Sequence, residues 1–238
     1  MRRTILVNLG AALMLSVCAL SRAPLLTVFG FEAPACDPSS FAFNGTTPTQ
    51  IIQPVGTDSI RDLKKKDIEG QLSDGLKAAG MNPLPNGVDG DIKGAVQDTF
   101  KSKFDAITFF QRTYVPTTQK RADQTIKILT VTWKTYLVTL LAKNASAMII
   151  DHEAGHRLIE QKLKDLAESK FSAVSNQILD KVMTDAQINA ILDPVFASLN
   201  AIGDAAQQAY EDATQGGTQG GADQQAQATA AFNAAASK

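Results

Sequence analysis

The sequence predicts a mainly α-helical protein, with an α+β fold as the alternative if a small sheet precedes its central helix. Apolar residues recur at helical spacing through the middle of the chain. A proline-rich segment comes before this region, and a segment rich in glycine, glutamine and alanine follows it. With 238 residues, of which 44% are hydrophobic and 20% charged, the chain is long enough to bury a core without disulfide bonds.

Residues 1–23 have the pattern of a secretory signal peptide. Arg2 and Arg3 are followed by an uncharged apolar run that continues to Leu20. This run is shorter than the roughly 20 residues that span a bilayer. We therefore expect export to the periplasm or the medium, with no stable transmembrane span after the signal is removed. The segment that ends at Cys18 also resembles a bacterial lipoprotein box, so a lipid anchor at Cys18 is the alternative to release.

The rest of the chain divides into a lead-in, one domain and a tail. Residues 24–58 are rich in proline, serine and threonine, and they predict an extended, loosely packed lead-in. Residues 59–212 carry the helical pattern and are expected to form a single mostly helical domain. Residues 213–238 consist largely of glycine, glutamine, threonine and alanine, which is typical of a flexible tail.

The first helix of the domain is predicted from its ends. Ser59-Ile-Arg-Asp62 is a capping-box pattern that would begin the helix, and Gly80 would end it. Helical spacing then continues through residues 92–107, although residues 104–115 also fit a strand. Residues 126–133 are ambiguous in the same way, because threonine and β-branched residues favour a strand while the apolar spacing fits a helix.

The best-defined helix is expected to begin after Ser146, which is suited to cap it. Seven residues fall on its apolar face, namely Met148, Ile149, His152, His156, Ile159, Leu163 and Leu166. Two further helical stretches lie near residues 171–183 and 191–212. The helix after Ser146 therefore has two histidines on the face that packs against the protein interior.

Residues 152–156 form an HExxH motif, His-Glu-Ala-Gly-His. At 100° per residue the two histidines lie about 40° apart on the helix, so both imidazoles can reach one ion. Zinc suits neutral imidazoles, and Glu153 could take a proton from a water molecule at the metal and pass it to a leaving amine. His152 and His156 are the only histidines in the chain. The motif therefore predicts zinc ligands at His152 and His156 and a catalytic general base at Glu153.

A zinc site needs a third protein ligand, and no histidine remains to supply it. Glu160 shares the motif helix, but three ligands from one helix face leave poor tetrahedral geometry. A carboxylate from a second helix is the better candidate, which favours Asp204, Glu211 or Asp212. The alternative interpretation is that the two histidines are buried on an apolar face and bind no metal.

The segment from Trp133 to Gly217 resembles a family of exported bacterial domains of unknown function that are regarded as zinc-dependent proteases of the zincin type. That family has a tryptophan about twenty residues before an HExGH motif and a later Tyr-Asp-x-x-Thr-x-His-Gly signature. Here Trp133 lies 19 residues before His152, glycine occupies the fourth motif position, and residues 210–217 resemble the signature. The resemblance implies a zincin-like helical core and a zinc cofactor.

The chain departs from this family at two positions of the signature. Gly216 stands where the family has its late histidine, the presumed third ligand, and Glu211 stands where the family has aspartate. Either Glu211 or Asp212 has therefore taken over coordination, or this protein is a degenerate relative that binds no metal.

These observations lead to two functional hypotheses. The first is an exported zinc metallopeptidase, a hydrolase of peptides or proteins, with metal ligands His152, His156 and Glu211 or Asp212. The second is a metal-free, zincin-like helical envelope protein with a structural or binding role. Trp133 and Tyr210 could line a substrate cleft, although a tryptophan at helical spacing is more often part of a core. The net charge of −1 argues against a nucleic-acid partner, which requires a basic surface.

Overall fold

The computed structural model describes residues 38–99, 105–217 and 223–238. The chain separates into two units, Met1–Ser39 and Ser40–Lys238, and the fold below is that of the second. The predicted signal peptide, Cys18 and most of the predicted lead-in before Ser40 lie outside the described residues.

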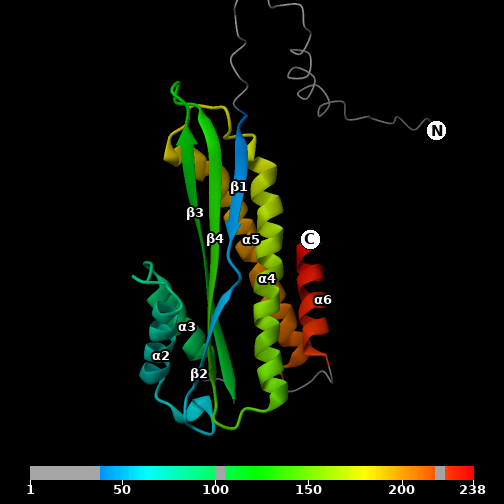
Figure 1. Cartoon of the computed structure of the whole chain (residues 1–238). Helices are drawn as coiled ribbons and strands as arrows, with labels where there is room; N and C mark the ends of the chain where they lie inside the picture. The colour runs from blue at the N-terminus through cyan, green and yellow to red at the C-terminus, as the bar shows by residue number, and fades with distance from the viewer. Residues whose placement is uncertain (1–37, 100–104, 218–222) are drawn as a thin grey trace, which may run out of the picture. The chain divides into compact units, whose positions relative to one another are not determined.

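A four-stranded mixed sheet is built around one long strand, β4 (Ile126–Leu141), as Figure 1 shows. On one side β4 pairs antiparallel with β3 (Ala106–Lys120). On the other side it pairs in parallel with β1 (Ser40–Gly45) and then with β2 (Thr49–Pro54), which follow one another along the same edge. The predicted lead-in therefore contains two strands, and the expectation of a loosely packed segment was wrong for residues 40–54.

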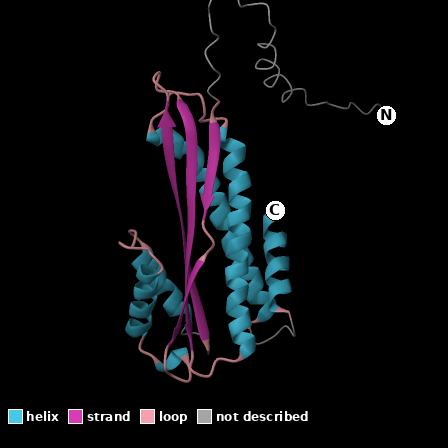
Figure 2. Ribbon diagram, in the orientation of Figure 1, coloured by secondary structure: helices cyan, strands magenta, loops and turns pink. Residues whose placement is uncertain are grey.

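Helices cover both faces of this sheet (Figure 2). On one face lie α2 (Lys65–Ala78) and α3 (Val88–Thr99). Over the other face lie α4 (Ala147–Ser175) and α5 (Asp185–Thr214), and α6 (Gln224–Ala236) packs against both of these. The fold is thus α+β rather than mainly α. Among the described residues, no helix combines the length and the apolar run that crossing a bilayer requires.

Residues 126–133 form the first half of β4, in which buried and half-buried positions alternate from Leu129 to Trp133. Leu129, Val131 and Trp133 belong to the core beneath α4, α5 and α6. Tyr136, Val138 and Leu140 in the second half of β4 belong to the core beneath α2 and α3. Continuous burial is confined to residues 135–140, whereas residues 129–133 alternate as in a strand with one buried face, and the helical spacing of Ile126, Leu129 and Trp133 was coincidental.

Several helix ends differ from the predictions. Residues 60–62 form a short 3-10 helix, and α2 begins at Lys65 rather than at the capping-box pattern. The N-cap at Ser146 is confirmed, since its hydroxyl accepts a hydrogen bond from the backbone N–H of Ile149. Of the helical stretch expected near residues 171–183, residues 171–175 are the end of α4, and the expectation was wrong for residues 176–183, which form turns and irregular structure.

The predicted flexible tail was wrong for residues 224–236, which form α6. Asp223 caps this helix by accepting a hydrogen bond from the backbone N–H of Ala226. Phe232 and several alanines of α6 are buried in the same core as Trp133. Small alanine side chains allow close packing of helices, so a composition without large apolar residues can still form a packed element.

We predict that Phe232→Ala destabilises the protein. Phe232 is 8% exposed and packs in the core with α4 and α5. Its truncation should lower the free energy of unfolding by about 3 kcal/mol, measured by chemical denaturation. Asn233→Ala, at the exposed neighbouring position of α6, is the control and should change it by less than about 0.5 kcal/mol. Equal, small effects of both changes would contradict the docking of α6.

Candidate metal centre

The HExxH residues lie in the interior, on the face of α4 that is turned toward the sheet and α5. His152, Glu153 and His156 are 2%, 6% and 6% exposed. Their ligand atoms lie within 4.8 Å of one another. Titratable groups buried to this degree need hydrogen-bond or charge partners, because the loss of hydration is otherwise costly. The partners of each group therefore define the site.

Glu211 of α5 supplies the carboxylate that faces both histidines. One of its oxygens, Oε1, lies 3.0 Å from Nε2 of His156 and 3.5 Å from Nε2 of His152. Two ligand atoms of a tetrahedral zinc ion lie about 3.3 Å apart when each is 2.0–2.1 Å from the metal. Both distances from Oε1 of Glu211 are thus close to the spacing of neighbouring ligand atoms around one ion.

The other ring nitrogen of each histidine has a polar partner of its own. Nδ1 of His156 lies 2.6 Å from Oε1 of Gln207. Nδ1 of His152 lies 3.2 Å from the hydroxyl of Thr214 and 3.4 Å from Oε1 of Gln224. These contacts hold both rings with Nε2 directed to Glu211, which is the role that outer partners play for metal-binding histidines. Because Gln224 belongs to α6, the segment predicted as a tail is part of the site.

Tyr210 and Gly155 explain how α4 and α5 approach so closely at the motif. The fully buried Tyr210 ring stacks on His152 with a centroid separation of 4.8 Å, and its hydroxyl donates to the backbone oxygen of His152. A Cβ atom at position 155 would lie 2.2 Å from this hydroxyl oxygen. The glycine of the motif therefore makes room for the tyrosine of the later signature. Burial raises the pKa of Tyr210, so the hydroxyl stays a donor.

Glu153 is held by a chain of hydrogen bonds that crosses the sheet. The hydroxyl of Thr108 on β3 donates to Oε2 of Glu153 at 2.5 Å. Thr108 lies 2.6 Å from the hydroxyl of Thr139 on β4, which accepts from the amide of Gln50 on β2. Since each hydroxyl has one proton, the donation to Glu153 requires that Thr139 donate to Thr108. Three strands thus direct a donor at the carboxylate of the predicted general base.

The charges of the site stabilise one another. Burial alone would lower the pKa of His156, but the hydrogen bond to Glu211 and the nearby charge of Glu153 outweigh it and raise this pKa to about 9. Burial would raise the pKa of Glu211, but hydrogen bonds from His152 and His156 lower it to about 2. In the protein without metal, His156 and Glu211 therefore form a charged pair at neutral pH.

The structure separates the candidates for the third ligand. Glu211 lies at the histidines, whereas Asp212 is exposed and accepts a hydrogen bond from Gln208, so Asp212 was a wrong candidate. Asp204 pairs with Arg112, and Glu160, although buried on α4, also pairs with Arg112.

Gly217 of the late signature and Trp133 both lie in the interior. Gly217 packs against His152, where an added Cβ atom would lie 2.8 Å from the Cβ of the histidine. Trp133 and Tyr210 are fully buried, which confirms the interpretation of Trp133 as part of a core and leaves neither residue at a cleft. Sequence reasoning missed Gln207, Gln224 and Thr108, because single polar residues in a helix or strand have no spacing that marks them.

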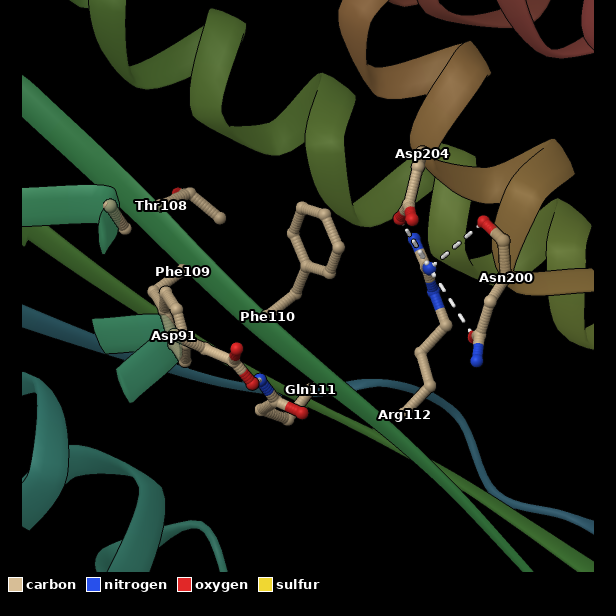
Figure 3. A pocket seen from close by; sticks show the side chains of 9 residues that line it. Asp91, Thr108, Phe109, Phe110, Gln111, Arg112, Asn200 and Asp204 are labelled. Carbon is tan, nitrogen blue, oxygen red and sulfur yellow. Dashed lines mark hydrogen bonds and ion pairs between the residues drawn. The ribbon is translucent and has the colours of Figure 1, made fainter. Parts of the chain in front are cut away.

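A cleft of about 440 Å³ lies along β3, and Thr108, the donor to Glu153, is part of its wall. Phe110 and Arg112 of β3 also line it, as do side chains from α3 and α5. Figure 3 shows Arg112 extending from β3 toward Asn200 and Asp204 of α5. The cleft is therefore bounded by helices from both faces of the sheet.

Comparison with known proteins does not assign the chain to a group. No family model matches it, and no curated protein and no solved structure matches it either. The resemblance to exported bacterial zincin-type domains therefore rests on the motif and the signature alone, and the zincin-like core stays a prediction.

We predict that Gly155→Ala destabilises the protein and disturbs the site. The added Cβ atom would overlap the hydroxyl and ring of Tyr210, so the contact between α4 and α5 would have to open. We expect the free energy of unfolding to fall by about 1–3 kcal/mol in chemical denaturation.

The matched control is Gly94→Ala in α3, where an added Cβ atom meets no heavy atom within 4 Å. This change should be neutral or stabilising by up to about 1 kcal/mol, because alanine favours a helix. If the two alanine variants have the same stability, the close approach at Gly155 does not exist.

Proposed function

We propose that the protein is a zinc-dependent metallopeptidase in which His152, His156 and Glu211 bind the metal and Glu153 is the general base. The observation that supports this most strongly is the position of Glu211 Oε1, at 3.0 and 3.5 Å from the two Nε2 atoms. Two imidazoles and one carboxylate with an open fourth position are a ligand set that catalytic zinc uses.

The residues around the ligands support the same assignment. Nδ1 of His156 has a partner in α5, and Nδ1 of His152 has partners in α5 and α6. Both rings are therefore held with Nε2 directed at Glu211. A bound zinc ion would polarise the substrate carbonyl and lower the pKa of water. Glu153 takes the proton of the attacking water on its carboxylate and delivers it to the nitrogen of the departing amine. Thr108 holds Oε2 of Glu153 during both transfers.

The substrate in this proposal is a peptide or protein that lies in the cleft along β3. Thr108, which donates to Glu153, is part of the wall of this cleft, and the wall also includes Phe110 and the carboxylates of Asp91 and Asp204. Export follows from the signal-peptide pattern of residues 1–23 and suits a hydrolase that acts outside the cytoplasm.

A structural role without metal is the second candidate, and the charged pair of His156 and Glu211 is the observation that favours it. The pair satisfies both groups in the absence of an ion, because the interaction raises the pKa of His156 and lowers that of Glu211. In that case the motif would stabilise the contact of α4 with α5.

We predict that the purified full-length protein takes up about one zinc ion per chain. His156→Ala and Glu211→Gln should lose this metal, since each removes a ligand. Glu153→Gln should keep the metal and lose about 10²–10⁴-fold in peptide hydrolysis, since it removes only the base. Metal content is measured by elemental analysis after dialysis against zinc, and hydrolysis with an unstructured protein substrate.

Asp212→Asn is the matched control, because it changes the acid adjacent to Glu211 that is exposed and bonded to Gln208. It should keep both metal and activity. Wild-type protein that takes up no zinc would favour the structural role, and zinc uptake without hydrolysis would reduce the proposal to metal binding alone.

A further inference from the structure

A buried network connects the charged residues Arg112 and Glu160, through Gln207, to the His156 ring. Arg112 of β3 donates to both oxygens of Glu160 on α4, at 2.8 Å from Nε and 2.6 Å from Nη2. Glu160 is fully buried, and the side chain of Arg112 is 4% exposed. The amide of Gln207 on α5 donates to the same carboxylate at 2.9 Å, and its oxygen faces Nδ1 of His156.

The charge of Glu160 determines which way the Gln207 amide is turned. The amide nitrogen can donate to Oε1 of Glu160, whereas a flipped amide would place its oxygen against the carboxylate. The nitrogen also donates to the backbone oxygen of His156 at 3.3 Å, which favours the same orientation. With the amide fixed in this way, its oxygen accepts a hydrogen bond, so Nδ1 of His156 must have the proton.

We propose that Glu160, held by Arg112, is a positioning residue that fixes the ring orientation and the Nδ1 proton of His156 through Gln207. With Nδ1 bonded to Gln207, Nε2 is the ring nitrogen that faces Glu211. On the function proposed above, it is also the nitrogen that binds zinc. Arg112 and Glu160 touch neither the metal ligand atoms nor the general base. They act on the site through the side-chain amide of Gln207.

The first test is made on metal-free protein, by nitrogen–proton correlation NMR of the imidazoles. Since the chain has two histidines, the ring signals are few and can be assigned with His152→Ala. Wild-type protein should show a slowly exchanging Nδ1–H signal of His156, whatever the charge on the ring. Gln207→Leu and Glu160→Gln should each lose that slow exchange. Gln208→Leu, at an exposed amide on the same helix, should retain it.

The second test measures zinc affinity by competition with a chromophoric chelator. Gln207→Leu and Glu160→Gln should bind zinc about 10–100-fold more weakly than wild type, as loss of an outer partner commonly does. Gln208→Leu should bind as wild type does. If wild type binds no zinc, the proposed function fails, and the NMR test still decides the role of Glu160.

Glu160→Gln leaves the exposed Asp204 as the remaining acidic partner of Arg112 among the described residues, so circular dichroism must first show that the variant keeps the native fold. The double variant Arg112→Met with Glu160→Gln removes the buried pair as a unit and leaves no uncompensated charge. It should show the same loss of slow Nδ1–H exchange. Slow exchange and wild-type zinc affinity in the folded variants without Glu160 would overturn the proposal and leave Arg112 and Glu160 as a structural ion pair.

Discussion

The contact of α4 with α5 at Gly155 and Tyr210 is the constraint on which the site depends. Because position 155 has no side chain, the tyrosine ring can lie against the motif and bond the backbone of His152. This approach brings Glu211, one residue after Tyr210, to both histidines. A side chain at position 155 would separate the two helices and with them the three groups that face one another.

Close packing of polar residues between helices has a cost, which the structure offsets with paired donors and acceptors. Among the described residues, every fully buried side-chain nitrogen or oxygen has a hydrogen-bond partner. Thr108 satisfies Glu153, and Gln207 satisfies His156. A polar cluster in which every member is bonded has few alternative arrangements, so the rings and carboxylates are held before any ligand arrives.

The sequence was sufficient for the parts of the site that lie within one periodic segment. The motif helix and its cap at Ser146 follow from the spacing along α4, whereas the sequence left Asp204, Glu211 and Asp212 as equal candidates for the carboxylate at the histidines. Residues 126–133 of β4 were ambiguous because Ile126, Leu129 and Trp133 also fit a helical spacing, and α6 was missed because its alanines pack without a large apolar stripe. Gln207 could not be identified, since it meets His156 from 51 residues away and only the packing of the helices brings them together.

The position of α6 has a consequence for the order in which the site is completed during synthesis. His152 and Gln224 are 72 residues apart, and the groups between them arrive with α5. A chain that emerges from the ribosome or from a translocation channel exposes both histidines well before Gln224 has appeared. The histidines are then held by neither Gln207 nor Gln224. The nascent protein therefore lacks the assembled cluster of His152, His156 and Glu211 until these last helices have docked.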